Sequence, residues 1–431
     1  MQKKRFKILI VPGLIPYPPD DGGKLCIYCF IDYLRKFHEI HLLLSCYSYK
    51  DEENVEALRR HWTDVEIYSV SLFEARQSEG MTGRIRYLFK RLLEKTIGKL
   101  EQNIVKNHPS YGWFTVEQTT PFYPLTHEFI KVLSGILANH RFDIIQTELT
   151  SMITLINLFP PTAKRIFVQI EERSGVIRDF GTTAGVSNDY VDYVAGNTEF
   201  LEFSYMARYD AVFALNDSDR LRISQKIPNL KVRTSPYGLL DRDLINAPDF
   251  NGFKAENLIF IGSELHYPNV DALNWFVDDL VVKFKSRPFK KIYVTGRWSE
   301  ATKQKLRFRE SSLEFIGFVD DLSPYLRKSV SIVPIRIGGG GIRTKILTAM
   351  MHGTPVVSTT LGSVGIKGLH PTELLISNTA DDFVRSIEEL FRDEGKCRNM
   401  ITSAYDLVKR EYSQSHVAEL RNSFYHEIVA E

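Results

Sequence analysis

Short runs of β-branched and other apolar residues alternate along the chain with longer stretches whose apolar positions recur at helical spacing. This alternation is typical of βα units, and near-continuous apolar runs such as KILIV and DIIQ favour parallel strands covered on both faces. In the first half, strands are predicted at Phe6–Val11, Glu39–Cys46, Val65–Val70, Asp143–Thr147, Arg165–Gln169, Ala211–Leu215 and Lys231–Pro236. Helical spacing between them predicts helices such as Lys24–Phe37 and Asn54–His61.

The alternation stops once and then restarts. Residues 239–257 are rich in Asp, Asn, Pro and Gly, which is typical of a connection between domains. After them, strands are predicted at Leu258–Gly262, Lys291–Thr295, Leu313–Ile316, Val330–Pro334, Thr354–Thr359 and Leu374–Ser377. We therefore expect a first domain at 1–240, a linker at 241–256, a second domain at 257–412 and a final helix at 413–431.

A chain of 431 residues is too long for one ordinary core, which agrees with two domains. The predicted fold class is α/β, with two Rossmann-like parallel-sheet domains that face a central cleft. In such folds the ligand binds beyond the carboxyl ends of the strands.

Composition and charge exclude several classes of protein. The chain is 43% hydrophobic and 25% charged, as expected for a globular protein, and its net charge of +2 gives no basic excess for a nucleic-acid partner. It has no run of about 18 apolar residues and no signal-peptide cleavage pattern, so we expect it to be cytoplasmic.

Metal and redox sites have little support in the sequence. Cys26 and Cys29 form a C-x-x-C, but they lie in an apolar helical pattern without a second Cys or His pair at zinc spacing. The eleven histidines form no ligand pattern either, so no metal site is expected.

Residues 83–100 form a separate feature, because their apolar positions follow one helical face and Arg and Lys follow the other. Such a basic amphipathic helix could make a peripheral contact with an anionic membrane. An ordinary surface helix packed on the first domain is the alternative.

The stretch PIRIGGGGIRTKILTAMMHGTPVVS, residues 334–358, carries the strongest signal for chemistry. A predicted strand ends at Pro334, four glycines follow at 338–341, and a helical pattern begins near Ile342. Glycines let backbone N–H groups approach a ligand, and a helix N-terminus attracts anions. Arg343 and Lys345 lie where the helix dipole disfavours cations, which suggests a bound pyrophosphate.

Further glycines follow other predicted strands. Gly22 and Gly23 lie between the first strand and the first helix, where phosphates bind in open α/β sheets, although a simple tight turn is equally consistent. In the second half, Gly262–Ser263, Gly296–Arg297 and Gly317–Val319 each follow a predicted strand. Their recurrence at successive strand ends predicts a nucleotide along that edge.

Four carboxylates follow strands of the first half and are candidates for acid–base work: Glu148, Glu171, Glu172 and Asp217. Glu171 and Glu172 are the best placed to orient or deprotonate an acceptor hydroxyl. The alternative is that they are loop carboxylates paired with Arg173 or with solvent.

These residues resemble the GT-B retaining glycosyltransferases, known as glycosyltransferase group 1 or family 4. GGGGIRTKILTAMMHGTPVVSTTLGSVGI looks like their donor-binding segment, and FIGSELHYPNVDALNWFVDDL and LEFIGFVDDLSPYLRKSVSIVPIRIG are similar to neighbouring parts of their second domain. PPDDGGKLCIYCFIDYLRKFHEIHLL resembles their first βα unit. The resemblance is strong across residues 257–373 and weak between about 75 and 230.

The resemblance implies a transferase of the hexosyltransferase type that acts in glycan or polysaccharide biosynthesis without a metal or other cofactor. Its donor would be a UDP- or GDP-sugar, and its acceptor a saccharide or lipid-linked saccharide. Arg343 and Lys345 would neutralise the diphosphate, and the final helix would return to the first domain. The implied donor-binding residues are Gly22, Gly23, Gly262, Ser263, Arg297, Phe318, Val319, Gly339, Gly340, Gly341, Ile342 and Thr348.

The sequence departs from this family around the helix that follows the glycines, and less strongly at Tyr237-Gly238, where an Asn-Gly is usual. The family has a pair of glutamates around the helix after the glycines, and here Gly340 and Thr348 stand at the matching positions. A threonine cannot bind two ribose hydroxyls as a carboxylate does. This departure keeps two alternatives open: a catalytically silent GT-B partner or regulatory subunit, and a sugar-nucleotide epimerase on the same fold.

Overall fold

The structure is a computed structural model that describes residues 4–20, 22–72, 122, 125–183, 186–244, 252–319, 321–338, 341–367, 369 and 371–430. The predicted helix at 83–100 and two of the four glycines, Gly339 and Gly340, lie outside the described residues.

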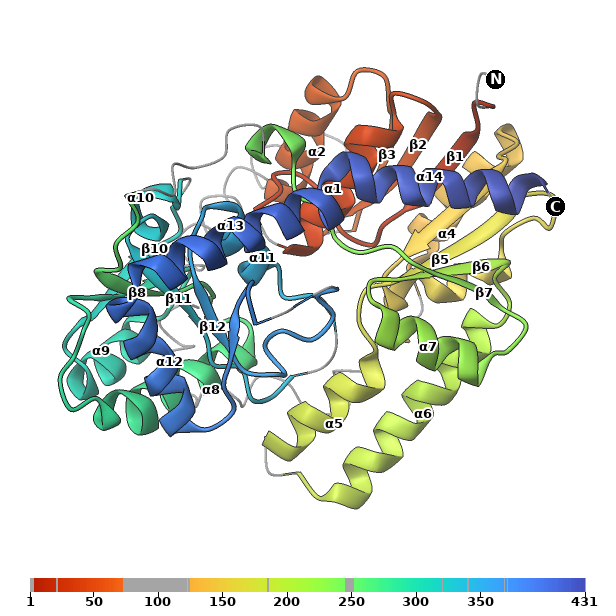
Figure 1. Cartoon of the computed structure of the whole chain (residues 1–431). Helices are drawn as coiled ribbons and strands as arrows, with labels where there is room; N and C mark the ends of the chain where they lie inside the picture. Colours follow the sequence, from red (N-terminus) through yellow and green to blue (C-terminus); the bar gives the residue numbers. More distant parts are fainter. Residues whose placement is uncertain are drawn as a thin grey trace, which may run out of the picture.

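Two parallel sheets organise the described chain, and Figure 1 shows them side by side. The first sheet has the strand order β3-β2-β1-β4-β5-β6-β7 and the second has β10-β9-β8-β11-β12-β13. The strands of the first sheet are β1 (Lys7–Val11), β2 (Glu39–Cys46), β3 (Glu66–Ser71), β4 (Ile144–Glu148), β5 (Lys164–Gln169), β6 (Ala211–Ala214) and β7 (Lys231–Thr234). Those of the second are β8 (Asn257–Phe260), β9 (Ile292–Thr295), β10 (Leu313–Gly317), β11 (Ser329–Val333), β12 (Val356–Ser358) and β13 (Leu375–Ile376).

Helices connect successive strands and cover the sheets. The first domain contains α1 (Gly22–Leu34), α2 (Tyr49–His61), α4 (His127–Asn139), the 3₁₀ helix η4 (Thr150–Asn157), α5 (Arg173–Thr183), α6 (Asn188–Met206) and α7 (Asp217–Lys226). The short 3₁₀ helix η5 (Asp241–Leu244) follows β7. The second domain contains α8 (Tyr267–Trp275), the π-helix η6 (Phe276–Leu280), η7 (Val281–Lys283), α9 (Glu300–Arg309), α10 (Ser323–Leu326), α11 (Thr344–Met351), α12 (Ala380–Arg392) and α13 (Glu394–Glu411), and α14 (Gln414–Ala430) ends the chain.

The burial of alternate residues explains why the apolar runs form central strands. Along β1, Ile8 and Ile10 pack in the core beneath α1 and α14, whereas Leu9 and Val11 pack on the opposite face with α4 and η4. Both faces of the first sheet are therefore covered, as the near-continuous apolar pattern predicted. The predicted α/β fold with two parallel-sheet domains is confirmed.

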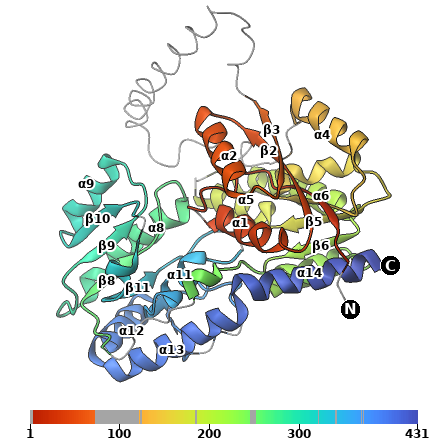
Figure 2. The ribbon, with the colours of Figure 1, turned by 90° about the horizontal axis from the view of Figure 1, so that it is seen from above.

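The chain crosses between the domains twice. Leu239 donates its N–H to the carbonyl of Tyr412 at 2.7 Å, and Gln414 donates to the carbonyl of Leu239 at 2.8 Å. After the second crossing, α14 packs against α1 of the first domain, and Figures 1 and 2 show it running from α13 across to that domain. The two crossing segments therefore form one hydrogen-bonded hinge.

A buried charge fixes α14 on the first domain. Arg421 is only 2% exposed, and its guanidinium lies 3.7 Å from the ring centre of Phe30. Its Nε donates to Ser235 Oγ at 2.9 Å, and its Nη1 lies 3.9 Å from Glu148 Oε1. Glu148 is itself buried, so this carboxylate faces α14 and is not a candidate for acid–base work in the cleft.

Cys26 and Cys29 are buried thiols in the same region, and none of the four cysteines forms a disulfide. Burial raises the pKa of both thiols, so they are protonated side chains of the core. The described residues contain no cluster of His, Cys, Asp and Glu that could hold a metal ion. None of the helices in the described ranges has the length and apolar character needed to cross a membrane.

We predict that Arg421→Met destabilises the first domain by about 3–5 kcal/mol, because it leaves the Glu148 carboxylate buried without its counter-charge. The free energy of unfolding in urea measures this loss, and adding Glu148→Gln should recover part of it. Glu427→Gln is the control on the same helix, since Glu427 pairs with Arg233 at the surface and should contribute less than about 1 kcal/mol. Equal, small losses in Arg421→Met and Glu427→Gln would contradict this account of α14.

Candidate active site

Three glycines bring the ends of β8, β9 and β10 into direct contact. Gly296 donates its N–H to the carbonyl of Gly317 at 2.7 Å, and a Cβ placed on Gly296 would lie 2.5 Å from the carbonyl oxygen of Gly262. Gly296 and Gly317 also have φ values of +84° and +74°, which favour glycine. Close approach and backbone conformation therefore both explain the glycine that recurs at these strand ends.

The glycine-rich stretch after β11 leads directly into α11. Arg343 is the N-cap residue of α11, and Lys345 lies in its first turn. Gly338 and Gly341 have φ values of +111° and +89°, and a Cβ on Gly338 would lie 2.8 Å from Pro268 Cγ. The glycines thus bring the backbone close to the start of α8 and turn it into a new helix.

Lys345 is held by a neutral side chain. Its Nζ donates to Asn269 Oδ1 at 2.5 Å and lies 5.2 Å from the ring centre of Phe260. Within the described ranges, no carboxylate forms an ion pair with this ammonium group. Burial, together with the charge of Arg343, lowers the pKa of Lys345 to about 7. A bound anion would favour the charged form and raise this pKa.

Arg343 adds to the positive potential around Lys345, and His266 lies beside both cations. Burial lowers the pKa of His266 to about 4, and the charges of Lys345 and Arg343 contribute, so this imidazole is neutral at physiological pH. Burial also lowers the pKa of Arg343, while the nearby acidic groups Glu171 and Asp179 oppose that change. Two cations therefore lie at the N-terminus of one helix, where the helix dipole adds to their positive potential.

The first domain touches this helix at a glycine. Gly22 begins α1, and a Cβ placed on it would lie 2.7 Å from Thr344 Oγ1 in the first turn of α11. Gly22 and Gly23 were predicted to form a turn before the helix, but they form the first turn of α1 itself. The N-termini of α1 and α11, one from each domain, consequently meet across the interdomain boundary.

A second contact between the domains lies on the other side of the glycine-rich stretch. A Cβ placed on Gly341 would lie 3.4 Å from the carbonyl oxygen of Ile170, just after β5. In α5, the Asp179 carboxylate accepts a hydrogen bond from the backbone of Gly338, and burial raises its pKa. Tyr267 of the second domain packs against the small core that α5 and α6 share. Asp179 is a site residue that the sequence analysis missed, because nothing marks it within an amphipathic helix.

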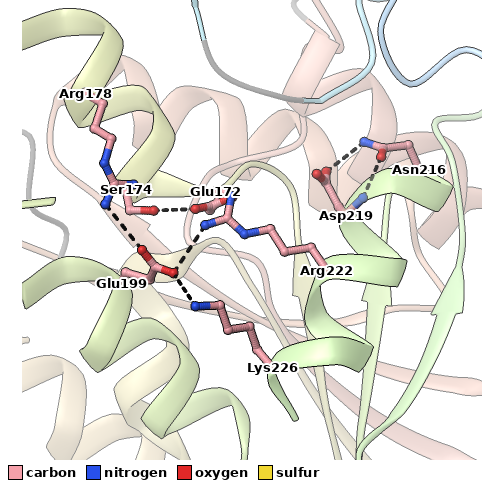
Figure 3. A network of polar contacts seen from close by, with 8 residues as sticks. All are labelled: Glu172, Ser174, Arg178, Glu199, Asn216, Asp219, Arg222 and Lys226. Carbon is pink, nitrogen blue, oxygen red and sulfur yellow. Dashed lines mark hydrogen bonds and ion pairs between the residues drawn. The ribbon is translucent and has the colours of Figure 1, made fainter. Parts of the chain in front are cut away.

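The two predicted acid–base glutamates are placed differently. Arg173 donates to Glu171 at 2.5 Å, and the Glu171 side chain remains 37% exposed and close enough to Arg343 to influence its pKa. Glu172 is buried, forms an ion pair with Arg222 and accepts a hydrogen bond from Ser174 (Figure 3). The pairing with Arg173 was the alternative interpretation for both glutamates, and here it holds for Glu171.

Glu172 belongs to a polar network at the base of the α5–α6 pair. The Glu199 carboxylate on α6 forms ion pairs with three cations, as Figure 3 shows. The nitrogen–oxygen distances are 3.4 Å to Arg178, 3.3 Å to Arg222 and 3.0 Å to Lys226. These ion pairs connect α5, α6 and α7. We therefore assign Glu172 to the framework that holds α5 against α6 and α7.

The remaining predicted donor residues surround α8 and α11. The carbonyl of Ser263 accepts a hydrogen bond from Asn269, and Ile342 is buried just before the cation pair. Arg297 is exposed at the end of β9 and Phe318 is 56% exposed after β10, with Val319 beside it. Thr348 lies half-buried in the second turn of α11. Gly262, Ser263, Asn269 and Lys345 are thus brought together, while Arg297 and Phe318 lie further along the same edge.

A cavity of about 260 Å³ lies beside this site, between the domains. Asn216, Asp217 and Thr234 line it from the first domain, and Lys367 and Tyr412 line it from the other side. Thr234 donates to Asp217 at 2.6 Å, so this carboxylate, a predicted acid–base candidate, is bound to its own domain. Neither Arg343 nor Lys345 lines the cavity.

Residues 255–393 match the family model described as "Glycosyl transferases group 1". The chain has the GT-B fold, and its second domain is similar to the glycosyltransferase group 1 family. The recognition made from the glycine-rich and strand-end motifs is therefore confirmed.

Relatives of this GT-B protein extend over the whole chain. It is 20% identical over 428 residues to an uncharacterised 44.6 kDa protein from the cps region of Klebsiella pneumoniae. The aligned region covers 95% of this chain and 97% of the relative. Sucrose-phosphate synthase from Thermosynechococcus elongatus has a TM-score of 0.68 at 13% identity and covers 99% of this chain and 100% of its own.

Two solved structures similar to this GT-B protein contain UDP. Staphylococcus aureus TarM, in complex with fondaparinux, alpha-GlcNAc-glycerol and UDP, has a TM-score of 0.63 at 14% identity, covering 97% of this chain and 99% of that one. Anabaena HepE in complex with UDP has a TM-score of 0.62 at 13% identity, covering 98% and 100%. The likeness establishes the shared fold, and together with the family match it supports a glycosyltransferase role in glycan biosynthesis.

A methyl group at Gly22 should disturb the contact between α1 and α11, because its Cβ would collide with both Thr344 Oγ1 and Cγ2. We expect Gly22→Ala to weaken UDP or GDP binding by about ten-fold, as a misplacement near 1 Å has large effects at such sites. Calorimetric titration measures the affinity. Alanine favours helix over glycine, so α1 itself should not be weakened.

Thr344→Ala removes both colliding atoms and should restore most of the affinity in the double variant with Gly22→Ala. Gly196→Ala is the control, because a Cβ there meets nothing within 4 Å. Unchanged binding in Gly22→Ala would show that the two helix ends do not meet in the ligand-bound protein.

Proposed function

We propose that the chain is a retaining, metal-independent glycosyltransferase of the hexosyl type. It transfers a sugar from a UDP- or GDP-sugar to a saccharide or lipid-linked saccharide during polysaccharide biosynthesis. The observation that carries this proposal is the position of Arg343 and Lys345 at the start of α11, opposite Gly22 of the other domain. A diphosphate between the lobes would receive two positive charges and the N–H groups of the helix N-terminus.

In this mechanism the bond between the anomeric carbon and the donor phosphate breaks, and a bond to the acceptor oxygen forms on the same face of the sugar. The departing phosphate takes the acceptor proton, so the diphosphate serves as both leaving group and base. Negative charge grows on the phosphate during this step, and fixed positive groups stabilise it. Arg343 and Lys345 supply that charge without a bound metal.

The similar proteins support the choice of substrates. TarM and HepE have been solved with UDP, and the TarM complex also contains a GlcNAc-glycerol. The relative from the cps region suggests a place in polysaccharide synthesis. A pyrophosphate-linked nucleotide and a hydroxyl-bearing saccharide are the substrates that agree with both.

The acceptor lies against the first domain in this proposal. Glu171 and Asp179 are the carboxylates of that domain that influence Arg343. Glu171 remains partly exposed, so it can orient an acceptor hydroxyl. Glu172 is buried in its ion pair and does not take part directly.

One observation favours a second candidate, a catalytically silent partner subunit. Thr348 stands where the family places a carboxylate for the ribose, and its side chain offers one hydroxyl. A silent subunit would bind donor nucleotides weakly and would neither transfer nor slowly hydrolyse the sugar. Product analysis with a panel of UDP- and GDP-sugars separates the two functions, and the anomeric configuration of the product tests retention.

We expect the double variant Arg343→Ala, Lys345→Ala to lose UDP or GDP affinity by at least about a hundred-fold, because each charge-assisted hydrogen bond contributes about 1.5–3 kcal/mol. The matched control is Lys303→Ala, Arg309→Ala, which removes the same two charges from α9 in the same domain. Isothermal titration of both variants gives the comparison. Equal affinities in the two double variants would overturn the assignment of the diphosphate.

A further inference from the structure

Asn269 connects the lysine of α11 to the loop after β8. Its Nδ2 donates to the carbonyl of Ser263 at 2.9 Å, and its Oδ1 accepts from Lys345 Nζ at 2.5 Å. A carbonyl oxygen can only accept and an ammonium can only donate, so these partners fix the orientation of the amide. Asn269 is 4% exposed, and the side chain therefore has one arrangement.

Gly262 makes room for this arrangement. A Cβ on Gly262 would lie 2.7 Å from Asn269 Cγ, which real side chains do not allow. The absence of a side chain at Gly262, after β8, thus leaves space for the amide of Asn269, and the end of β9 also packs closely against this glycine. Residues far apart in the sequence, Gly262 and Ser263, Asn269 and Lys345, meet in this one contact.

Among the residues that the structure describes, no carboxylate pairs with the charge of Lys345. Phe260 faces it from β8, the amide of Asn269 faces it from α8, His266 faces it from the preceding loop, and Arg343 faces it from its own helix. A neutral acceptor orients the ammonium group without cancelling its charge, whereas a carboxylate there would form an ion pair.

We infer that Asn269 is a positioning residue that aims Lys345 at the donor diphosphate while leaving the lysine charge for the ligand to neutralise. This inference rests on the proposed function, since it names how that site binds its diphosphate. It assigns to Asn269 a role in donor affinity that a purely structural amide would not have.

Proton linkage follows from the same geometry. In the free protein the pKa of Lys345 is lowered to about 7, and a bound diphosphate raises it. Above pH 7, binding must therefore take up a proton at Lys345, and affinity for the diphosphate falls as the pH rises. Below that pH the lysine is already charged, so its contribution to the pH dependence disappears. The second phosphate ionisation of the ligand lies near pH 6 and is avoided by working between pH 7.5 and 9.

The experiment is calorimetric titration of the full chain with UDP and GDP between pH 7.5 and 9, in two buffers with different ionisation enthalpies. Wild-type protein should take up a proton on binding. Asn269→Asp should bind about ten-fold more weakly or worse and take up less proton at Lys345, because the new carboxylate pairs with Lys345 beforehand. Asn269→Ala should also bind more weakly but keep the proton uptake.

Asn274→Asp is the matched control, since Asn274 lies on the same helix and bonds to Val270 and Arg309, away from the cations. It should leave both affinity and proton uptake unchanged. Thermal unfolding of each variant checks the fold, and proton uptake in wild type needs no variant at all.

The outcomes separate this inference from the proposed function. If wild type binds neither UDP nor GDP, the proposed function fails. If wild type binds a diphosphate without proton uptake, or if Asn269→Asp matches wild type in affinity and pH dependence, the role given to Asn269 is overturned.

Discussion

The buried ammonium group of Lys345 at the interdomain boundary is the constraint on which the rest of the structure depends. Arg343 and Lys345 occupy the start of a helix, where the dipole already disfavours cations. The Lys345 ammonium group donates its hydrogen bond to the amide of Asn269 instead of to a carboxylate. The molecule therefore holds the Lys345 ammonium group in a place that costs folding free energy, and a bound anion would make this place favourable.

Glycines, an ion-pair network and the final helix hold the elements around these cations in position. Glycines at the ends of β8, β9 and β10 let three loops touch, and Gly22 lets the other domain approach α11. The ion-pair network around Glu172 and Glu199 (Figure 3) holds α5 in position. In this position Asp179 reaches the glycine-rich stretch. Arg421 and Glu148 fix α14 on the first domain, and Leu239 bonds to Tyr412 and Gln414 where the chain crosses between the lobes.

Much of the fold could be predicted from the sequence because buried parallel strands leave a strong local signal. Each described strand overlaps a predicted one, from the KILIV run in β1 to the short β13. The glycine-rich stretch could also be recognised in the sequence as a candidate anion site, since glycines beside an arginine and a lysine have no simple structural explanation. The resemblance to a known family added the expectation that the last helix returns to the first domain.

Other parts could not be predicted, because they depend on which side chains meet in space. Glu148 follows a strand like the other candidate carboxylates, yet Arg421, which is distant in sequence, pairs with it beneath α14. Asp179 and Asn269 carry no local signal, and their partners come from another domain or another helix. Gly22 looked like part of a turn, although the helix begins at that residue.

A crystal structure of the chain with UDP or GDP bound tests the central claim most directly. The account predicts the diphosphate between α1 and α11, with its oxygens within hydrogen-bonding distance of Arg343 and Lys345 and with Asn269 still accepting from the lysine. A diphosphate bound elsewhere, with Lys345 pointing away from it, would contradict the account.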